Sequence, residues 1–115
     1  MKKFLEKRPW GGFERFTLNE KSTVKILTVN PKQKFSLQHH NKRSEFWLFL
    51  DNQAKVTIGK KIIKAKKGTE IFIPKKTLHR IEALNKPVRV LEISLGEFKE
   101  SDIVRLDDVY GRIKS

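Results

Sequence analysis

The 115-residue chain contains no cysteine, and it has only four prolines and six glycines. Without cysteine, a disulfide framework, a thiolate nucleophile and a cysteine-based zinc site are all excluded. Long apolar runs are also missing: the run around the central motif, Phe46–Leu50, is far shorter than the roughly 20 residues of a membrane-spanning helix. The first residues lack the apolar core of a signal peptide, so we expect a soluble cytoplasmic protein with no membrane contact.

Acidic residues are scarce as well. The chain has 13 of them against 26 lysines and arginines, which gives a net charge of +13. Such an excess of positive charge would suit a protein that binds nucleic acid. However, the lysines are scattered, and no basic helix or interleaved aromatic residues accompany them. We therefore interpret the charge as a solvated surface with lysines at strand edges, an interpretation compatible with a pocket for a phosphorylated small molecule.

Short segments with period-two alternation of apolar residues dominate the pattern, and turn residues separate them. Such a pattern is typical of an all-β sandwich or barrel. The predicted strands are Thr23–Val29, Phe35–His40, Glu45–Leu50, Ala54–Ile58, Lys61–Ala65, Thr69–Ile73, Leu78–Glu82 and Val88–Leu95.

The length suits one domain with its own core, which we expect to span residues 1–115. Within it the pattern predicts an N-terminal arm over 1–21, a barrel over about 22–98 and a tail over 99–115. The tail holds the sole helical candidate, near Ser101–Leu106, where Ser101 would cap the helix and Asp102 would face its positive end.

Four polar residues have a spacing that indicates a metal site. Gln38, His40 and Glu45 form a Q-x-H-x4-E motif, and His79 ends a later G-x5-P-x4-H motif. Residues two apart in a strand share a face, so Gln38 and His40 would point the same way and His39 would point to the outer face. This donor set suits a divalent metal, with Zn²⁺ favoured and Mn, Co, Ni or Fe as alternatives.

Both motifs resemble those of the cupin superfamily, which implies a double-stranded β-helix, or jelly-roll-like, barrel whose metal ligands come from adjacent strands. Gln38 stands where the general motif has its first histidine. Three positions that are glycine in the general motifs carry other residues here, namely Lys32, Asn52 and Lys76.

A closer resemblance covers about residues 8–112. Six segments occur in the same order as in the cupin domain of type II mannose-6-phosphate isomerases, a domain often fused to a mannose-1-phosphate guanylyltransferase. The segments are Arg8–Gly11, Ser36–His40 with Arg43–Trp47, His79–Ile81, Asp102–Arg105 and Asp108–Arg112.

This resemblance implies interconversion of mannose 6-phosphate and fructose 6-phosphate with a metal held by Gln38, His40, Glu45 and His79. Arg43, inside the motif, is the first candidate for substrate binding and catalysis. Arg105, Arg112 and Lys25 are further substrate-binding candidates, and Glu92, a carboxylate in an apolar strand, is the leading candidate for the general base.

Two alternatives stay open. One is a non-catalytic cupin that binds a sugar phosphate or a metal, as a sensor or as the partner of a separate guanylyltransferase. The other is a different metal chemistry on the same barrel, since one fold hosts many reactions. The apolar N-terminal segment through Trp10 and Phe13, together with the dimerisation common among cupins, predicts a homodimer.

Overall fold

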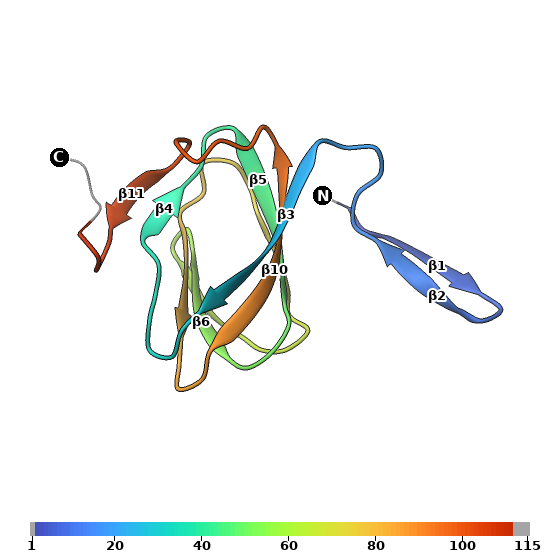
Figure 1. Ribbon diagram of the computed structural model, residues 1–115, viewed down its shortest axis with the longest axis horizontal. Helices are drawn as coiled ribbons and strands as arrows, with labels where there is room; N and C mark the ends of the chain where they lie inside the picture. Colours follow the sequence, from blue (N-terminus) through green and yellow to red (C-terminus); the bar gives the residue numbers. More distant parts are fainter. Residues whose placement is uncertain (1, 112–115) are drawn as a thin grey trace.

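The computed structural model describes residues 2–111, and within them every regular element is a β-strand. A hairpin formed by β1 (Phe4–Arg8) and β2 (Gly11–Arg15) projects away from the rest of the chain (Figure 1). Residues 2–111 contain no helix that is long and apolar enough to cross a membrane.

The remaining strands form two antiparallel sheets that face each other (Figure 1). The four-stranded sheet has the order β3 (Ser22–Val29), β10 (Val88–Gly96), β5 (Arg43–Phe49) and β8 (Glu70–Ile73). The five-stranded sheet has the order β11 (Val104–Asp107), β4 (Leu37–His39), β9 (His79–Ala83), β6 (Ala54–Ile58) and β7 (Lys61–Ala65). Consecutive strands thus alternate between the two sheets, except for β6 and β7, which pair with each other.

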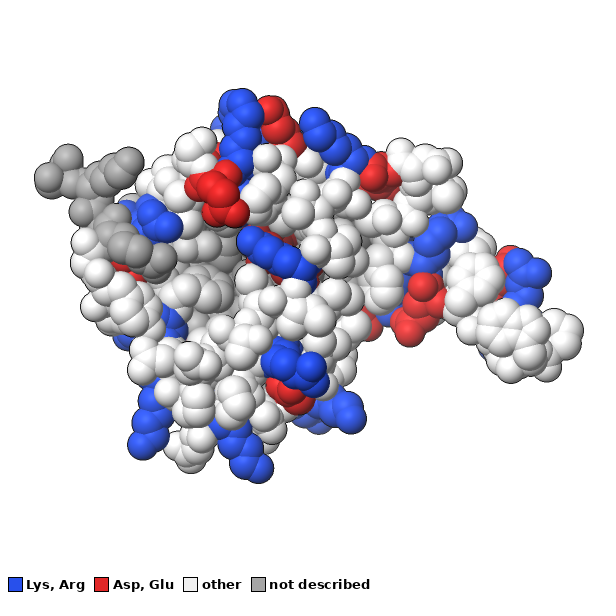
Figure 2. Space-filling model, viewed as in Figure 1, with Lys and Arg blue, Asp and Glu red and all other residues white. Residues whose placement is uncertain are grey.

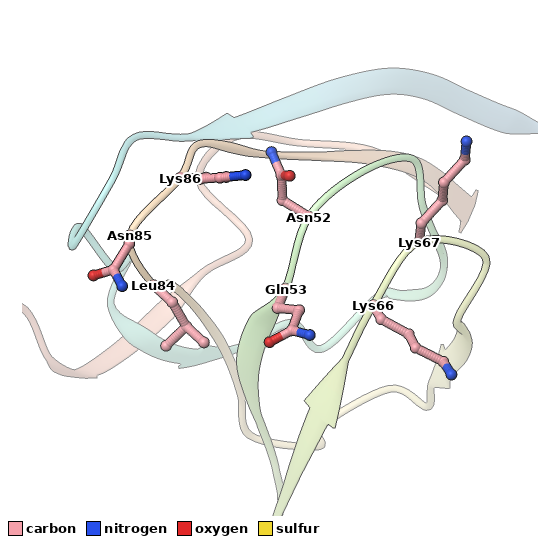
Figure 3. Close-up of a pocket in the computed structure, with 7 residues that line it drawn as sticks. All are labelled: Asn52, Gln53, Lys66, Lys67, Leu84, Asn85 and Lys86. Carbon is pink, nitrogen blue, oxygen red and sulfur yellow. The ribbon is translucent and has the colours of Figure 1, made fainter.

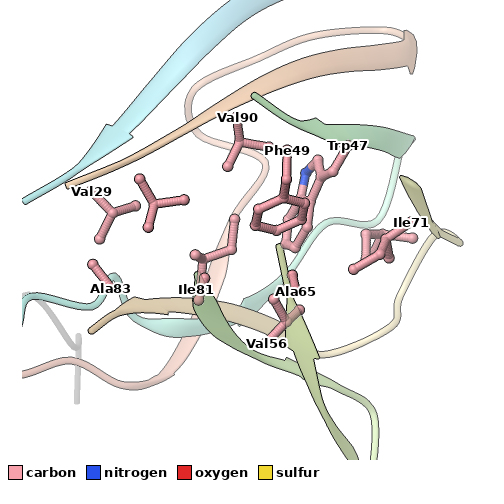
Figure 4. Close-up of a cluster of buried hydrophobic side chains, with 12 residues drawn as sticks. Val29, Trp47, Phe49, Val56, Ala65, Ile71, Ile81, Ala83 and Val90 are labelled. Carbon is pink, nitrogen blue, oxygen red and sulfur yellow. The ribbon is translucent and has the colours of Figure 1, made fainter. Parts of the chain in front are cut away.

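The core lies between the sheets, where the inward side chains of both interdigitate (Figure 4). Trp47 and Phe49 of the four-stranded sheet are at most 1% exposed, and Val56 and Ile81 of the five-stranded sheet are completely buried. Alternation along each strand places these residues inside, because successive side chains point to opposite faces. The all-β fold predicted from the sequence is confirmed.

The predicted C-terminal helix is wrong. Residues Val104–Asp107 instead form β11, which pairs with β4. The carboxylate of Asp102 accepts hydrogen bonds from the backbone N–H groups of Asn41 and Lys42, so it does not face the positive end of a helix as predicted. The β1–β2 hairpin is a further difference, because no strand was predicted within the N-terminal arm.

Lysine and arginine side chains are spread over the face shown in Figure 2, and several of them lie beside acidic groups. One example of such pairing is Arg89 with Asp51, whose Nε and Oδ2 atoms are 2.7 Å apart. On this face the positive charge is dispersed, as expected for a solvated surface.

The three positions where the cupin motifs have glycine keep a left-handed backbone in this chain. The φ angles of Lys32, Asn52 and Lys76 are +61°, +51° and +64°. A side chain in this conformation costs roughly 1–2 kcal/mol, less for asparagine than for lysine. The turns of the motif therefore persist although two of the glycines are replaced by lysine.

The strain at Lys76 leads to a prediction about stability. Lys76 is exposed, and its backbone N–H donates to the carbonyl oxygen of His40 at 2.7 Å. Lys76→Gly relieves the strain and keeps that hydrogen bond, so the free energy of unfolding should rise by about 0.5–1 kcal/mol. Lys75→Gly is the matched control, because Lys75 is also exposed but has no positive φ, and it should be destabilising. Urea titration of both variants checks the sign, and a loss of stability in Lys76→Gly contradicts the prediction.

Candidate metal centre

His40, Glu45 and His79 meet between the two sheets at one end of the barrel. His40 directly follows β4, Glu45 lies near the start of β5, and His79 is the first residue of β9. Each is at most 3% exposed, and one potential ligand atom from each lies within 4.8 Å of the others. The Glu45 carboxylate lies between the imidazoles, with Oε2 3.5 Å from Nε2 of His40 and Oε1 3.5 Å from Nε2 of His79.

The far nitrogen of each imidazole is held by a backbone carbonyl. Nδ1 of His40 lies 2.6 Å from the carbonyl oxygen of Asp102, and Nδ1 of His79 lies 2.9 Å from that of Thr77. A carbonyl oxygen only accepts hydrogen bonds, so both neutral rings carry their proton on Nδ1. Both Nε2 lone pairs are thereby directed toward Glu45, the arrangement found in histidines that bind metals.

Two buried atoms of this cluster lack a hydrogen-bond partner among residues 2–111: Oε1 of Glu45 and Nε2 of His79. Unpaired buried polar atoms are rare because each costs about 1–3 kcal/mol. A divalent cation would satisfy both atoms, since carboxylate oxygen and imidazole nitrogen are common zinc ligands. The residues present therefore fit a metal ion.

Gln38 and Arg105 form a row with His79 across three strands. Gln38 is opposite His79 in the ladder, and Arg105 of β11 is opposite Gln38, so the three side chains share a face. The amide oxygen of Gln38 accepts a hydrogen bond from Oγ of the buried Ser36 at 2.6 Å. Nε of Arg105 is buried and has no hydrogen-bond partner in the described part of the chain. Its neighbour in the chain, Leu106, is exposed.

Two other residues named by the sequence analysis have different placements. His39 is half-buried and is opposite Val104 of β11, outside the cluster of His40, Glu45 and His79. Arg112 lies outside the described residues.

Arg43 is buried beside the cluster. Its Nε lies 3.3 Å from Oε2 of Glu45, and its Nη2 lies 3.3 Å from Nε2 of His40. Nη1 donates to the carbonyl oxygen of Lys99 at 3.2 Å, and the guanidinium lies 4.3 Å from the ring centroid of Phe98. Each nitrogen of the guanidinium thus has a partner within the protein.

Glu92 is the second buried carboxylate of this end of the barrel. It is 4% exposed, and it lies two residues before Ser94, which is opposite Glu45, so both carboxylates share the inner face. Oε1 of Glu92 accepts a hydrogen bond from Ser94 Oγ at 3.2 Å and lies 3.6 Å from Nζ of Lys25. The Lys25 side chain is 38% exposed, so it connects Glu92 with solvent.

Burial governs the protonation of the cluster. It lowers the pKa of His79 to about 4, and it also lowers the pKa of His40, which keeps both rings neutral near pH 7. Burial raises the pKa of the Glu45 carboxyl. Burial and the nearby Glu45 charge both raise the pKa of the Glu92 carboxyl, against the attraction of Lys25.

A separate cavity of about 490 Å³ lies at the other end of the barrel, between turns that follow β5, β7 and β9 (Figure 3). Lys66, Lys67 and Lys86 contribute to its walls. The side chains of Lys66 and Lys67 extend to opposite sides in Figure 3, so these two cations do not converge on one point. This cavity is distinct from the candidate metal centre, because none of its lining residues belongs to that cluster.

The residue that sequence reasoning missed as a site component is Asp102, which was assigned to a helix start. Its carbonyl contact with His40 joins positions 62 residues apart, so no local pattern reveals it. One indication in the sequence that Asp102 matters for the site is its position in the Asp102–Arg105 segment that resembles the isomerase domain.

Comparison with solved structures identifies the fold. The chain superposes on a cupin protein from Bacteroides fragilis with a TM-score of 0.61 at 19% identity, over 74% of this chain and 76% of that one. The fold is therefore the cupin double-stranded β-helix. Residues 3–108 match the family described as mannose-6-phosphate isomerase C-terminal, and the chain belongs to this family.

Curated relatives support this assignment. The xanthan biosynthesis protein XanB of Xanthomonas campestris pv. campestris is 35% identical over 107 residues, which cover 91% of this chain and 23% of XanB. A mannose-1-phosphate guanylyltransferase of Escherichia coli (strain K12) is 35% identical over 108 residues, which cover 92% of this chain and 23% of that protein. The chain thus spans less than a quarter of the length of these two relatives.

The lowered pKa of His79 predicts acid sensitivity of the metal-free protein. Between about pH 6.5 and pH 4 the unfolded chain binds a proton at this residue that the folded chain does not, so stability rises with pH across this window. The pKa difference corresponds to at most roughly 3 kcal/mol. His79→Gln removes the titrating group, so in the presence of a chelator the variant should lose less stability than wild type between pH 7 and pH 4.5. Equal losses in urea titrations of the two proteins contradict this.

Proposed function

We propose that this chain is a metal-dependent aldose–ketose isomerase that interconverts mannose 6-phosphate and fructose 6-phosphate in the cytoplasm. The observation that carries the proposal is the buried set of His40, Glu45 and His79, with both Nε2 lone pairs facing the carboxylate, in a member of the mannose-6-phosphate isomerase C-terminal family. Gln38, on the same face as His79, is the proposed fourth ligand.

Zn²⁺ is the favoured metal because the donor set combines two imidazole nitrogens with oxygen ligands, and Mn, Co, Ni and Fe remain alternatives. When bound, such an ion supplies a Lewis acid for the oxygen atoms on C1 and C2 of the sugar. The reaction also needs a group that moves a proton between these two carbons, and the protein must provide it.

Glu92 is the proposed general base. In the aldose-to-ketose direction its carboxylate accepts the proton from C2, the electrons of the C2–H bond form the C1–C2 double bond, and those of the C1=O bond move onto O1 to give an enediolate. The O2 proton then passes to O1, and the C2=O bond forms as the carboxylic acid returns the first proton to C1. A base that must accept and return a proton works best with a pKa near the operating pH, and the raised pKa of Glu92 supports this role. Lys25, which lies between Glu92 and solvent, is proposed to bind a sugar hydroxyl.

The two arginines have different proposed roles. Every guanidinium nitrogen of Arg43 has a protein partner, and two of these partners are His40 and Glu45. We therefore propose that the positive charge of Arg43 compensates negative charge at the reacting centre. Arg105 shares a face with Gln38 and His79, and its Nε is unpaired, which supports a role in binding the substrate phosphate. Arg112 stays a substrate-binding candidate from sequence resemblance alone.

A second candidate function is sugar-phosphate or metal binding without turnover. The observation in its favour is a departure from the cupin motifs: Gln38 stands where they have a histidine, and Lys32 and Lys76 stand where they have glycine. On this reading the chain acts as a sensor or as the partner of a separate guanylyltransferase of GDP-mannose biosynthesis.

A coupled assay of mannose 6-phosphate conversion, with metal-stripped and metal-reconstituted protein, separates the two candidates. We expect activity only with metal, and kcat at least about 100-fold lower in His40→Ala and Glu92→Gln. Arg105→Ala should chiefly raise KM, about tenfold or more, and Arg105→Lys should recover part of the loss. The control Arg89→Ala removes the same charge from an exposed ion pair and should change neither constant. Substrate binding without turnover by the reconstituted wild type decides for the binder.

We also infer that two copies associate through the outer face of the four-stranded sheet. On this face Val24 and Ile26 of β3 are 57% and 55% exposed, and Phe72 of β8 is 40% exposed, although the outer face of an antiparallel sheet is normally polar. The β1–β2 hairpin, which carries Trp10 at 74% exposure and Leu5 at 64%, projects away from its own barrel (Figure 1). Each copy thus offers an apolar arm and an apolar face that a second copy can cover.

Light scattering tests this inference. Wild type should have twice the 13.5 kDa mass of the chain, and Ile26→Asp should be a folded monomer, because a charge in a desolvated contact is strongly unfavourable. Ile62→Asp is the matched control, since Ile62 is 63% exposed on β7 of the other sheet, and it should leave the dimer intact. A monomeric wild type at micromolar concentration refutes the inference.

A further inference from the structure

The segment that follows β10 passes back over the loop that carries His40. It leaves the sheet at Gly96, whose φ is +107° and where a Cβ atom would lie 3.0 Å from the carbonyl oxygen of Lys42. At its other end, Asp102 contacts the same loop. Residues 97–103, which we name the strap, therefore begin and end against residues 40–42.

Asp102 makes three contacts with this loop. Its two carboxylate oxygens accept hydrogen bonds from the backbone N–H groups of Asn41 and Lys42, both at 2.9 Å. Its backbone carbonyl oxygen accepts the proton of His40 Nδ1 at 2.6 Å. One residue thus binds three consecutive positions of the loop, and the first of them is a proposed metal ligand.

The strap also receives Arg43, the next residue along. The carbonyl oxygen of Lys99 accepts from Nη1 of Arg43 at 3.2 Å, and it accepts from the backbone N–H of Asp102 at 3.0 Å. Phe98 lies 4.3 Å from the guanidinium of Arg43 and 4.8 Å from the ammonium of Lys25. The strap therefore contacts three side chains of the site: Asp102 contacts His40, Lys99 and Phe98 contact Arg43, and Phe98 also contacts Lys25.

We propose that Asp102 is a positioning residue for the candidate metal centre: its carboxylate fixes the strap to the loop 40–42, so that its carbonyl oxygen holds the His40 proton on Nδ1. The metal-binding atom is then Nε2, which lies beside Glu45 and Arg43. The proposal rests on the metal site put forward under Proposed function. Groups that orient a metal-binding histidine typically change metal affinity 10–100-fold when they are lost.

His79 provides a comparison inside the same protein. Its Nδ1 is held by the carbonyl oxygen of Thr77, two residues earlier in the chain, and so it does not depend on the strap. Loss of the Asp102 carboxylate should therefore disturb the His40 ring and leave the His79 ring unchanged. A merely structural role of Asp102 would disturb both rings together, because they lie 5.1 Å apart in the same core.

The experiment uses Asp102→Ala and Asp102→Asn in the whole chain, and Glu100→Ala as the matched control. Glu100 is an exposed carboxylate of the same strap, so its loss changes the charge equally. In the metal-free proteins, ¹⁵N NMR of the imidazole rings should show His40 with its proton on Nδ1 in wild type and in Glu100→Ala. Asp102→Ala should show a mixture of both tautomers for His40 alone, and Asp102→Asn, which keeps one acceptor, should be intermediate.

Zn²⁺ affinity, measured by competition with a chelator, is the second readout. It should fall about 10–100-fold in Asp102→Ala, less in Asp102→Asn, and not at all in Glu100→Ala. Unchanged His40 signals in Asp102→Ala, or equal changes at His40 and His79, overturn the proposal. If Asp102→Ala does not fold, Asp102→Asn is judged by the same criteria.

These outcomes are distinct from those that bear on the isomerase. A wild type that binds Zn²⁺ but converts no sugar phosphate ends the proposed reaction and leaves the positioning role intact. A wild type that binds no Zn²⁺ ends the metal site, while the tautomer measurement in metal-free protein still decides whether Asp102 holds His40.

Discussion

The burial of Glu45 is the constraint on which the rest of this structure depends. Its carboxylate is 2% exposed inside a barrel whose neighbouring core is apolar, and a buried charge is costly unless other groups compensate it. The fold supplies Arg43 at 3.3 Å on one side and the two imidazoles on the other. Since both imidazoles offer lone pairs and no protons to Glu45, a metal cation is the natural complement to the set.

The division of the strands between two sheets explains how these groups meet. Glu45 comes from the four-stranded sheet, while His40 directly follows β4 and His79 begins β9, two strands of the five-stranded sheet. Both sheets contribute side chains to the same interior, so candidate ligands that are far apart in sequence converge at one end of it. The strap, which follows β10, also contributes to the site, because its backbone carbonyl groups contact His40 and Arg43.

Most of the strands could be predicted from the sequence, because their alternation is local information. Thr23–Val29 and Val88–Leu95 each differ from the observed strand by one residue at one end. The clustering of His40, Glu45 and His79 was also predicted. Their spacing resembles the cupin motifs, and this resemblance implies that the three residues lie close together on adjacent strands. The strand at Val104–Asp107 could not be predicted, because its partner β4 and the loop residues that bind the Asp102 carboxylate lie 60 or more residues away.

X-ray absorption spectroscopy of the zinc-reconstituted protein tests the central claim most directly, because it counts the ligands of the bound ion. The account predicts two imidazole ligands together with oxygen ligands, all at roughly 2.0–2.2 Å, and one imidazole fewer in His79→Ala. A spectrum without imidazole scattering, or one that His79→Ala leaves unchanged, would contradict the claim that His40, Glu45 and His79 form a metal centre.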